Sequence, residues 1–265
     1  MNNARPNKSA ARSAEILEFI AENERPVTLA EICKGLNIPK TSTFEIIYTL
    51  IDKRFLELAD EKLKTFKLGL KAFQVGVSYL MNTNLHKEAR PVLENLMAVT
   101  GHSILLGVES EGRIVYLDKF ESPSETVKFE AKLGSSNPLH CTGLGKALLA
   151  AYTNERVKEL TGGGRLTPKT QFSIQSCEEL VLDLDRIRKR GYSLDNKESE
   201  VNIACIAAPI YDHFNRAVAA ISMRCLESLL DEEKISKLSP LVVDSAMLIS
   251  RKLGFLKHRL YFQED

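Results

Sequence analysis

The residues with the greatest potential for chemistry lie in the second half of the chain. A phosphate-binding loop is suggested by the glycines and lysine of Gly143-Leu144-Gly145-Lys146. Such a loop, however, has four residues between its glycines and a Ser or Thr after the lysine. Here one residue separates the glycines and Ala147 follows the lysine, which argues against nucleotide hydrolysis. The segment is more typical of a turn that opens a helix near Thr142, where free backbone amides favour an anion.

Two chemistries based on cysteine and histidine are alternatives. His140, Cys141 and Cys205 could supply a nucleophile and its base, and His140 with Asp195, Glu198 and Cys205 could bind a metal. Both cysteines lie in apolar surroundings, where a thiol is usually a small buried hydrophobic group. The five cysteines include no CxxC pair, which disfavours structural zinc and a disulfide framework. We therefore expect no catalytic residue, no bound metal and no cofactor.

The composition predicts a globular protein of two domains. The 265 residues exceed the usual size of one domain, and the hydrophobic and charged fractions of 44% and 27% are ordinary. The net charge of +1 neither supports nor excludes a nucleic-acid partner, because a neutral domain can dilute a basic one. The longest apolar runs, Ile203–Tyr211 and Ala217–Met223, are too short to span a membrane. With no signal-peptide pattern, we expect a cytoplasmic protein.

The N-terminal segment has the pattern of three helices followed by a hairpin. Helical spacing of apolar residues predicts helices at residues 13–24, 28–37 and 40–53. Ser13 is the expected N-cap of the first helix, and Thr28 with Glu31 forms a capping box at the second. The apolar side of the third helix comprises Phe44, Ile47, Tyr48, Leu50 and Ile51. Two short helices joined by a tight turn form the helix-turn-helix pattern.

The third predicted helix begins with lysine and small hydroxyl side chains, which can approach phosphates and base edges without steric conflict. Alternating segments around Asp60-Glu61-Lys62 predict a hairpin that would act as a wing, with lysines that attract phosphates. Arg5, Lys8 and Arg12 predict a short basic arm. The predicted DNA-binding residues are Lys40, Thr41, Ser42, Thr43, Glu45, Lys62 and Lys64. On pattern alone, an unrelated three-helix bundle with a hairpin is the alternative.

The pattern changes after a helix predicted at residues 69–84. Strands are predicted at 103–109, 114–120, 126–133, 192–196, 203–212 and 217–224, and helices at 85–100, 142–152, 155–160, 176–190 and 231–253. Strands that run in hairpins with helices beside them indicate an α+β domain on an antiparallel sheet.

Three blocks of residues resemble the isocitrate-lyase-regulator (IclR) family of bacterial transcription factors. They are Thr28–Ile32 with Asn37–Thr43, then Asn137–His140 with Thr142–Ala150, then Arg190–Tyr192, Asp195, Glu198 and Cys205–Pro209. Because the blocks occur in order, the resemblance extends over essentially the full length. It implies a winged helix-turn-helix DNA-binding domain at 1–68, a linker helix at 69–84, and a GAF-like effector-binding and oligomerisation domain at 85–265. It also implies a homodimer or tetramer on palindromic double-stranded operator DNA.

The resemblance further implies that the effector is a small carboxylate. By motif, its pocket carries over to Gly143, Leu144, Asp195, Cys205 and Ser222. The chain departs from the family after Ser222, where a second Ser followed by Gly-Pro is usual and Arg224 occurs instead. Side chains alternate along a strand, so Arg224 shares a face with Ser222, and its guanidinium would bind a carboxylate directly. Family members for hexuronate and ketogluconate breakdown also vary here, so a sugar acid is the first expectation.

These observations predict a repressor of a catabolic operon, gated by a small organic acid such as a sugar acid, and not an enzyme. One alternative is a small-molecule enzyme that uses Cys205 with His140 or a metal. The other is a ligand-sensing partner protein that does not bind DNA. Glu45 keeps this second alternative open, because the family usually has Arg at that position. The change removes a phosphate contact, although Glu45 could accept a hydrogen bond from a cytosine amino group.

Overall fold

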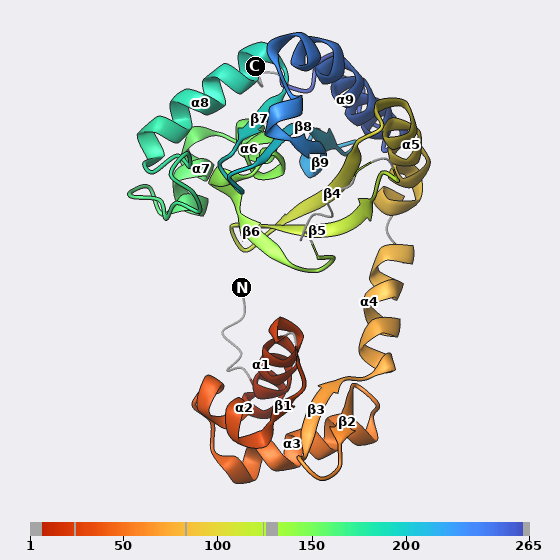
Figure 1. Ribbon diagram of the computed structural model, residues 1–265, viewed down its shortest axis with the longest axis vertical. Coiled ribbons are helices and arrows are strands. Elements are labelled where there is room, and N and C mark those ends of the chain that lie inside the picture. The colour runs from red at the N-terminus through yellow and green to blue at the C-terminus, as the bar shows by residue number, and fades with distance from the viewer. Residues whose placement is uncertain (1–6, 24, 83, 124, 126–131, 262–265) are drawn as a thin grey trace. The chain divides into compact units, whose positions relative to one another are not determined.

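The structure is a computed structural model that describes residues 7–23, 25–82, 84–123, 125 and 132–261 (Figure 1). The chain divides into two units, Met1–Thr83 (unit 1) and Asn84–Asp265 (unit 2), each with its own apolar core. Within the described ranges, no helix is long and apolar enough to cross a membrane.

Unit 1 contains helices α1 to α4 and a three-stranded antiparallel sheet. The helices are α1 (Lys8–Glu22), α2 (Leu29–Leu36), α3 (Lys40–Asp52) and α4 (Leu70–Asn82). The strands are β1 (Val27–Thr28), β2 (Leu56–Asp60) and β3 (Thr65–Leu68), in the order β1-β3-β2. Ile16, Ile32, Ile47 and Phe66 join α1, α2, α3 and β3 in one core. The helix-turn-helix and its wing are therefore present, as predicted.

Local capping defines the start of α2 and the turn between α2 and α3. The Thr28 hydroxyl accepts a hydrogen bond from the Glu31 amide at 3.3 Å, and the Glu31 carboxylate accepts one from the Thr28 amide at 2.7 Å. This is the predicted capping box. Helix α2 ends at Asn37, whose φ of 53° is left-handed, a conformation that asparagine adopts more readily than most residues. Pro39 then precedes α3, with its φ of −64° set by the ring.

Helix α1 begins earlier than the sequence pattern predicts. Asn7, and not Ser13, is the N-cap: its side-chain oxygen accepts hydrogen bonds from two backbone amides at 3.0 and 3.1 Å. The Ser13 hydroxyl instead donates to a carbonyl one turn earlier in the helix. Lys8 and Arg12 therefore belong to α1 and not to a basic arm, which corrects that prediction. Arg5 lies outside the described residues.

Unit 2 is built on a six-stranded antiparallel sheet of order β6-β5-β4-β9-β8-β7. The strands are β4 (Ser103–Ser110), β5 (Arg113–Phe120), β6 (Ser136–Pro138), β7 (Ser193–Asn196), β8 (Ile203–Tyr211) and β9 (Ala217–Leu226). The helices are α5 (Asn84–Thr100), α6 (Gly143–Ala150), α7 (Asn154–Thr161), α8 (Cys177–Arg190) and α9 (Glu232–Lys252). Most of the strand predicted at 126–133 falls on residues 126–131, which lie outside the described residues.

Side chains of the central strands alternate between two cores. Ile206 and Met223 pack in the core that includes α5 and α9. Leu105, Ala207 and Ala220 pack in the core that includes α6 and α8. The sheet is thus covered by helices on both faces (Figure 1). Ala207 of β8 and Ala220 of β9 lie on the face that packs against α6. The α+β class predicted from the sequence is confirmed.

Candidate functional site

The outer face of α3 is the first candidate site. Lys40, Thr41 and Glu45 are exposed, as a DNA-contacting face requires. Ser42 is half-buried, and its hydroxyl accepts a hydrogen bond from the Arg12 guanidinium of α1 at 3.3 Å. The first turn of α3 therefore presents a lysine ammonium and hydroxyl groups close to the surface.

The structure corrects one predicted contact of this helix. Thr43 is fully buried, and its hydroxyl donates to the Pro39 carbonyl at 2.8 Å. It lies on the inner face of α3 with Ile47 and Leu50, which follow it at intervals of four and three residues. The Thr43 side chain is part of the core of unit 1 and is not available to DNA.

The structure also places two aromatic residues opposite to their predicted side. Phe44 and Tyr48 are 48% and 44% exposed to solvent, and their ring centroids lie 4.3 Å apart. With Thr41 and Glu45 they occupy positions spaced three or four residues apart, so they share the outer face. Apolar side chains on such a face can contact thymine methyl groups in the major groove. The helical spacing of Thr43, Ile47 and Leu50 is the sequence signal that could have identified the buried face of α3 and placed Phe44 and Tyr48 on the outer face.

The wing is the hairpin of β2 and β3. Asp60 closes its turn by accepting hydrogen bonds from the amides of Lys62 and Leu63 at 2.7 and 2.8 Å. Lys62 and Lys64 are exposed at the tip, and neither forms an ion pair with another residue that the structure describes. Their ammonium groups are therefore free to neutralise phosphates.

The second candidate site lies where β7, β8 and β9 face the start of α6. Asp195, Cys205 and Arg224 are cross-strand neighbours in one row, and they are 1%, 6% and 4% exposed. A Cβ on Gly143 would lie 3.2 Å from the Cβ of Cys205 and 3.7 Å from that of Asp195. The absence of a side chain at Gly143 therefore lets α6 approach this row closely.

The remaining predicted effector residues lie beside this row. Ser222 pairs with Ala207, whose Cβ would also lie 3.4 Å from a Cβ on Gly143. Leu144 is buried in the core that α6 shares with the sheet. The structure thus brings Gly143 close to the predicted effector residues of β7, β8 and β9, and it places Leu144 in the adjacent apolar core. Arg224 and Ser222 lie on the α6 side of β9.

Tyr116 packs in the same core as Leu144 and Ala207, and the sequence analysis did not single it out. It is buried on β5, and its hydroxyl accepts a hydrogen bond from the Asn137 amide at 2.9 Å. Burial raises the pKa of Tyr116 to about 12, and the charges of Asp195 and Arg224 both act on it. A neutral phenol at this position can donate a hydrogen bond to a ligand.

The acidic groups of the site are engaged with the turn that joins β7 to β8. Burial raises the pKa of Asp195, against the opposing effect of its hydrogen bonds. Asp195 accepts hydrogen bonds from the amides of Glu198 and Ser199 at 2.8 and 3.2 Å, and from the Ser199 hydroxyl at 2.5 Å. The Arg224 guanidinium forms an ion pair with Glu200 of the same turn.

Lys146 is buried and is not available to a phosphate. Its ammonium lies 2.5 Å from Glu198 and 3.0 Å from Asp183, and its side chain is 2% exposed. Burial alone would lower the pKa of Lys146, but the two carboxylates outweigh it and raise the pKa above its usual value. For Glu198, by contrast, burial raises the pKa to about 7, although Lys146 opposes this. The three side chains tie α6 to α8 and to the β7–β8 turn.

The burial of Cys141 and Cys205 does not support a cysteine nucleophile. Burial raises the pKa of Cys141 to about 12 and that of Cys205 well above its usual value, whereas a nucleophilic cysteine needs a lowered pKa. The His140 ring nitrogen lies 3.1 Å from the Thr167 carbonyl. In the described part of the chain, no three His, Cys, Asp or Glu side chains are grouped so that they could hold a metal.

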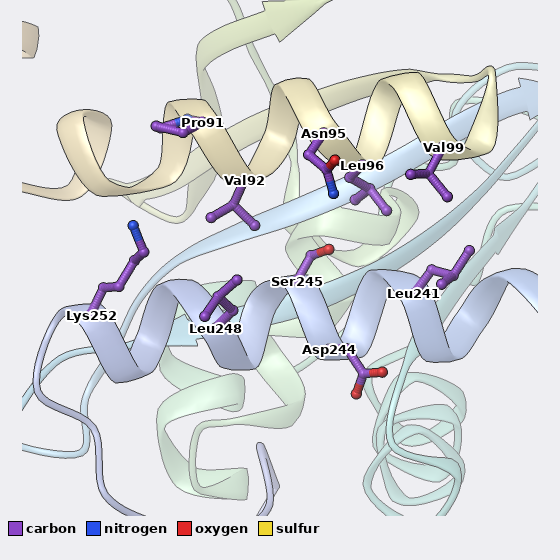
Figure 2. A pocket seen from close by; sticks show the side chains of 10 residues that line it. All are labelled: Pro91, Val92, Asn95, Leu96, Val99, Leu241, Asp244, Ser245, Leu248 and Lys252. Atoms are coloured by element: carbon purple, nitrogen blue, oxygen red, sulfur yellow. The ribbon is translucent and has the colours of Figure 1, made fainter.

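A groove of about 430 Å³ lies between α5 and α9 (Figure 2). Its lining is mostly apolar and includes Val92, Leu96 and Leu248. These two helices cover the opposite face of the sheet from Arg224, so the groove and the candidate effector site are different places.

Comparison with known proteins gives a consistent result for both units. Residues 77–251 match the family described as Bacterial transcriptional regulator IclR C-terminal, and residues 9–59 match the IclR helix-turn-helix domain. The chain is 32% identical to the HTH-type transcriptional repressor AllR of Escherichia coli (strain K12), over 93% of this chain and 90% of that protein.

Two solved structures extend the comparison. The crystal structure of the Thermotoga maritima IclR is 32% identical to the chain, with a TM-score of 0.74 over 93% of this chain and 99% of that one. An IclR homolog from Microbacterium hydrocarbonoxydans, complexed with 4-hydroxybenzoate, shares the fold at 19% identity and a TM-score of 0.81, over 93% and 99%. From both family matches and the helix-turn-helix of unit 1, we conclude that the chain belongs to the IclR family of bacterial transcriptional regulators and is a DNA-binding protein, not an enzyme.

Proposed function

We propose that the chain represses a catabolic operon and that a small organic acid, held by Arg224, controls its binding to operator DNA. The observation that carries this proposal is the buried guanidinium of Arg224 in a site next to the start of α6. A guanidinium presents a planar set of donors that matches a carboxylate, and burial strengthens the pairing.

A sugar acid fits the rest of this site best. The Tyr116 phenol, the Ser222 hydroxyl and the Asp195 carboxylate offer donors and acceptors for the hydroxyl groups of such a ligand. The complex of the Microbacterium homolog with 4-hydroxybenzoate supports a carboxylic acid as the class of effector. An aromatic acid is therefore the second ligand class to test.

The DNA-binding half of the proposal assigns the outer face of α3 to the major groove. Lys40 and the wing residues Lys62 and Lys64 would contact phosphates, while Thr41, Phe44 and Glu45 would face base edges. We propose a homodimer or tetramer that binds a palindromic operator, with α4 as the link between the units. The name of the repressor AllR supports the repressor role.

Operator binding tests this proposal directly. Fluorescence anisotropy would measure binding of the full chain to the intergenic DNA upstream of its own gene, as a function of salt. We expect Lys40→Ala to weaken binding to all sequences and to reduce the slope of log K against log salt by about one. Lys237→Ala, a change of an exposed lysine on α9, is the matched control and should leave the slope unchanged. No binding at low salt, with or without candidate acids, would refute the proposal.

The effector half needs a separate measurement. A panel of sugar acids and aromatic acids is added to the protein–DNA complex, and the acid that changes the affinity is titrated by calorimetry. Arg224→Gln should keep operator binding and lose most of the acid affinity, because it removes the charged donor. An unchanged acid affinity in this variant would exclude Arg224 from the site.

A further inference from the structure

The Arg224 guanidinium, which we assign to the effector carboxylate, is already paired with a carboxylate of the protein itself. Glu200, on the β7–β8 turn, forms an ion pair with Arg224. The Arg224 side chain is 5% exposed, whereas the Glu200 side chain is 43% exposed. Glu200 therefore extends from the surface into the buried site. It offers Arg224 the same chemical group that an acid effector would offer.

The backbone around Glu200 is held on both sides. The amide of Lys197 donates to the Ile203 carbonyl at 2.9 Å, and the amide of Ile203 donates to the Glu200 carbonyl at 3.1 Å. The nearby residue Glu198 is held by Lys146 at 2.5 Å, and its carbonyl accepts a hydrogen bond from the Ser173 hydroxyl at 2.6 Å. Movement of the Glu200 carboxylate away from Arg224 therefore needs only rotation of its side chain.

We propose that Glu200 is an internal substitute for the effector carboxylate, and that an acid effector binds by displacing it from Arg224. This inference rests on the proposed role of Arg224 as the effector-binding group. Removing a partner from a buried charge is costly unless another group of opposite charge replaces it. A carboxylate ligand makes that replacement and a neutral ligand of the same shape does not. Glu200 thus makes the site selective for acids, because only a ligand that carries a negative charge replaces its ion pair with Arg224.

Exchange of the carboxylate for an amide tests the proposal. Full-length wild type and Glu200→Gln are titrated with sodium acetate and with sodium gluconate, and binding is measured from the rise in melting temperature. Sodium chloride matches the ionic strength, and acetamide is the neutral counterpart of acetate. Because the side-chain amide of the variant carries no charge that competes with the ligand, we expect the variant to bind both acids about 5- to 30-fold more tightly. Acetamide should show no such gain.

Two further variants make the test specific. Glu227→Gln removes an ion pair with Lys197 at 2.9 Å, which ties the same turn but does not involve Arg224. It should leave the affinity for both acids unchanged. Glu200→Asp keeps the charge on a shorter side chain and should give an affinity between those of wild type and Glu200→Gln.

The outcomes separate this inference from the proposed function. Equal or weaker acid binding by Glu200→Gln, an equal gain for acetamide, or no acid binding by any variant would overturn the inference. If the inference is overturned but an acid still alters operator binding by the wild type, the proposed function holds without the displacement of Glu200. Tighter acid binding by Glu200→Gln, without any acid effect on operator binding, would support the displacement of Glu200 and refute the gating of DNA binding.

Discussion

Gly145 lies in contact with the backbone of the segment that precedes α6. A Cβ at this position would lie 2.2 Å from the carbonyl oxygen of Leu139, 2.5 Å from its Cα and 2.7 Å from its carbonyl carbon. These backbone atoms belong to the 3₁₀ turn Leu139–Cys141 and cannot rotate away as a side chain can. The Gly145 amide also donates to the Thr142 hydroxyl at 3.1 Å. Gly145→Ala therefore requires α6 to move away from this turn.

The size of the effect follows from two opposing contributions. Alanine stabilises a helix by about 1 kcal/mol relative to glycine. Overpacking of a core commonly costs about 1–3 kcal/mol and more where the overlap is with rigid atoms. We expect Gly145→Ala to lower the free energy of unfolding of unit 2 by roughly 3 kcal/mol or more. For a domain of this size, that lowers the melting temperature by roughly 6–12 °C.

Gly143→Ala is the matched control on the same helix. Its Cβ would lie 3.2 Å from the Cβ of Cys205 and 3.4 Å from that of Ala207, a tight contact that a shift of a few tenths of an ångström relieves. We expect its free energy of unfolding to stay within about 1 kcal/mol of the wild type. Because the methyl group fills space beside the Arg224 row, it should reduce the affinity for the acid effector.

Urea unfolding followed by circular dichroism measures both variants, since the chain has no tryptophan for a fluorescence signal. A Gly145→Ala protein within about 1 kcal/mol of wild type would refute the packing argument. The same holds if Gly143→Ala is the less stable of the two proteins.

Three further changes give measurable results. Lys146→Met should lower the free energy of unfolding by roughly 3–5 kcal/mol, because it leaves the buried Glu198 without its cation. Urea unfolding measures this, and adding Glu198→Gln to that variant should recover part of the loss. The pKa of Glu198 is raised from 4.5 to about 7, so the folded protein holds this proton more tightly than the unfolded chain does. The resulting stability is fully present below about pH 4.5 and is lost as the pH rises through 7. The loss of stability between these pH values should be smaller in Glu198→Gln than in the wild type. Identical slopes of unfolding free energy against pH in the two proteins would contradict this prediction. Phe44→Ala should weaken operator binding by about 5-fold and abolish its sensitivity to replacement of thymine by uracil, measured by anisotropy; a variant that keeps the sensitivity would exclude Phe44 from thymine contacts.

Features with local causes were predicted correctly. The capping box at Thr28 depends on residues three positions apart, and alternation along one strand placed Arg224 on the same face as Ser222. Strand β8 was predicted at 203–212 and spans Ile203–Tyr211, because an apolar run bounded by turns is itself the signal of a buried strand. Predictions were wrong where two local interpretations of the same residues compete. Asn7 and Ser13 are both good N-caps, and the apolar run of α3 fits two helical phases that differ by one residue.

The sequence by itself determined the family, the order of the longer helices and strands, and the face of β9 that carries Arg224. These depend on motifs and on periodicities within single elements. The sequence did not predict the short strands β1 and β6. Only the tertiary structure decided that Lys146 meets Asp183 and Glu198, which lie 37 and 52 positions away along the chain. It also decided that Glu200 reaches Arg224. Contacts of this kind depend on strand register and on the packing of α6 against the sheet, which the whole core sets together and no local pattern encodes.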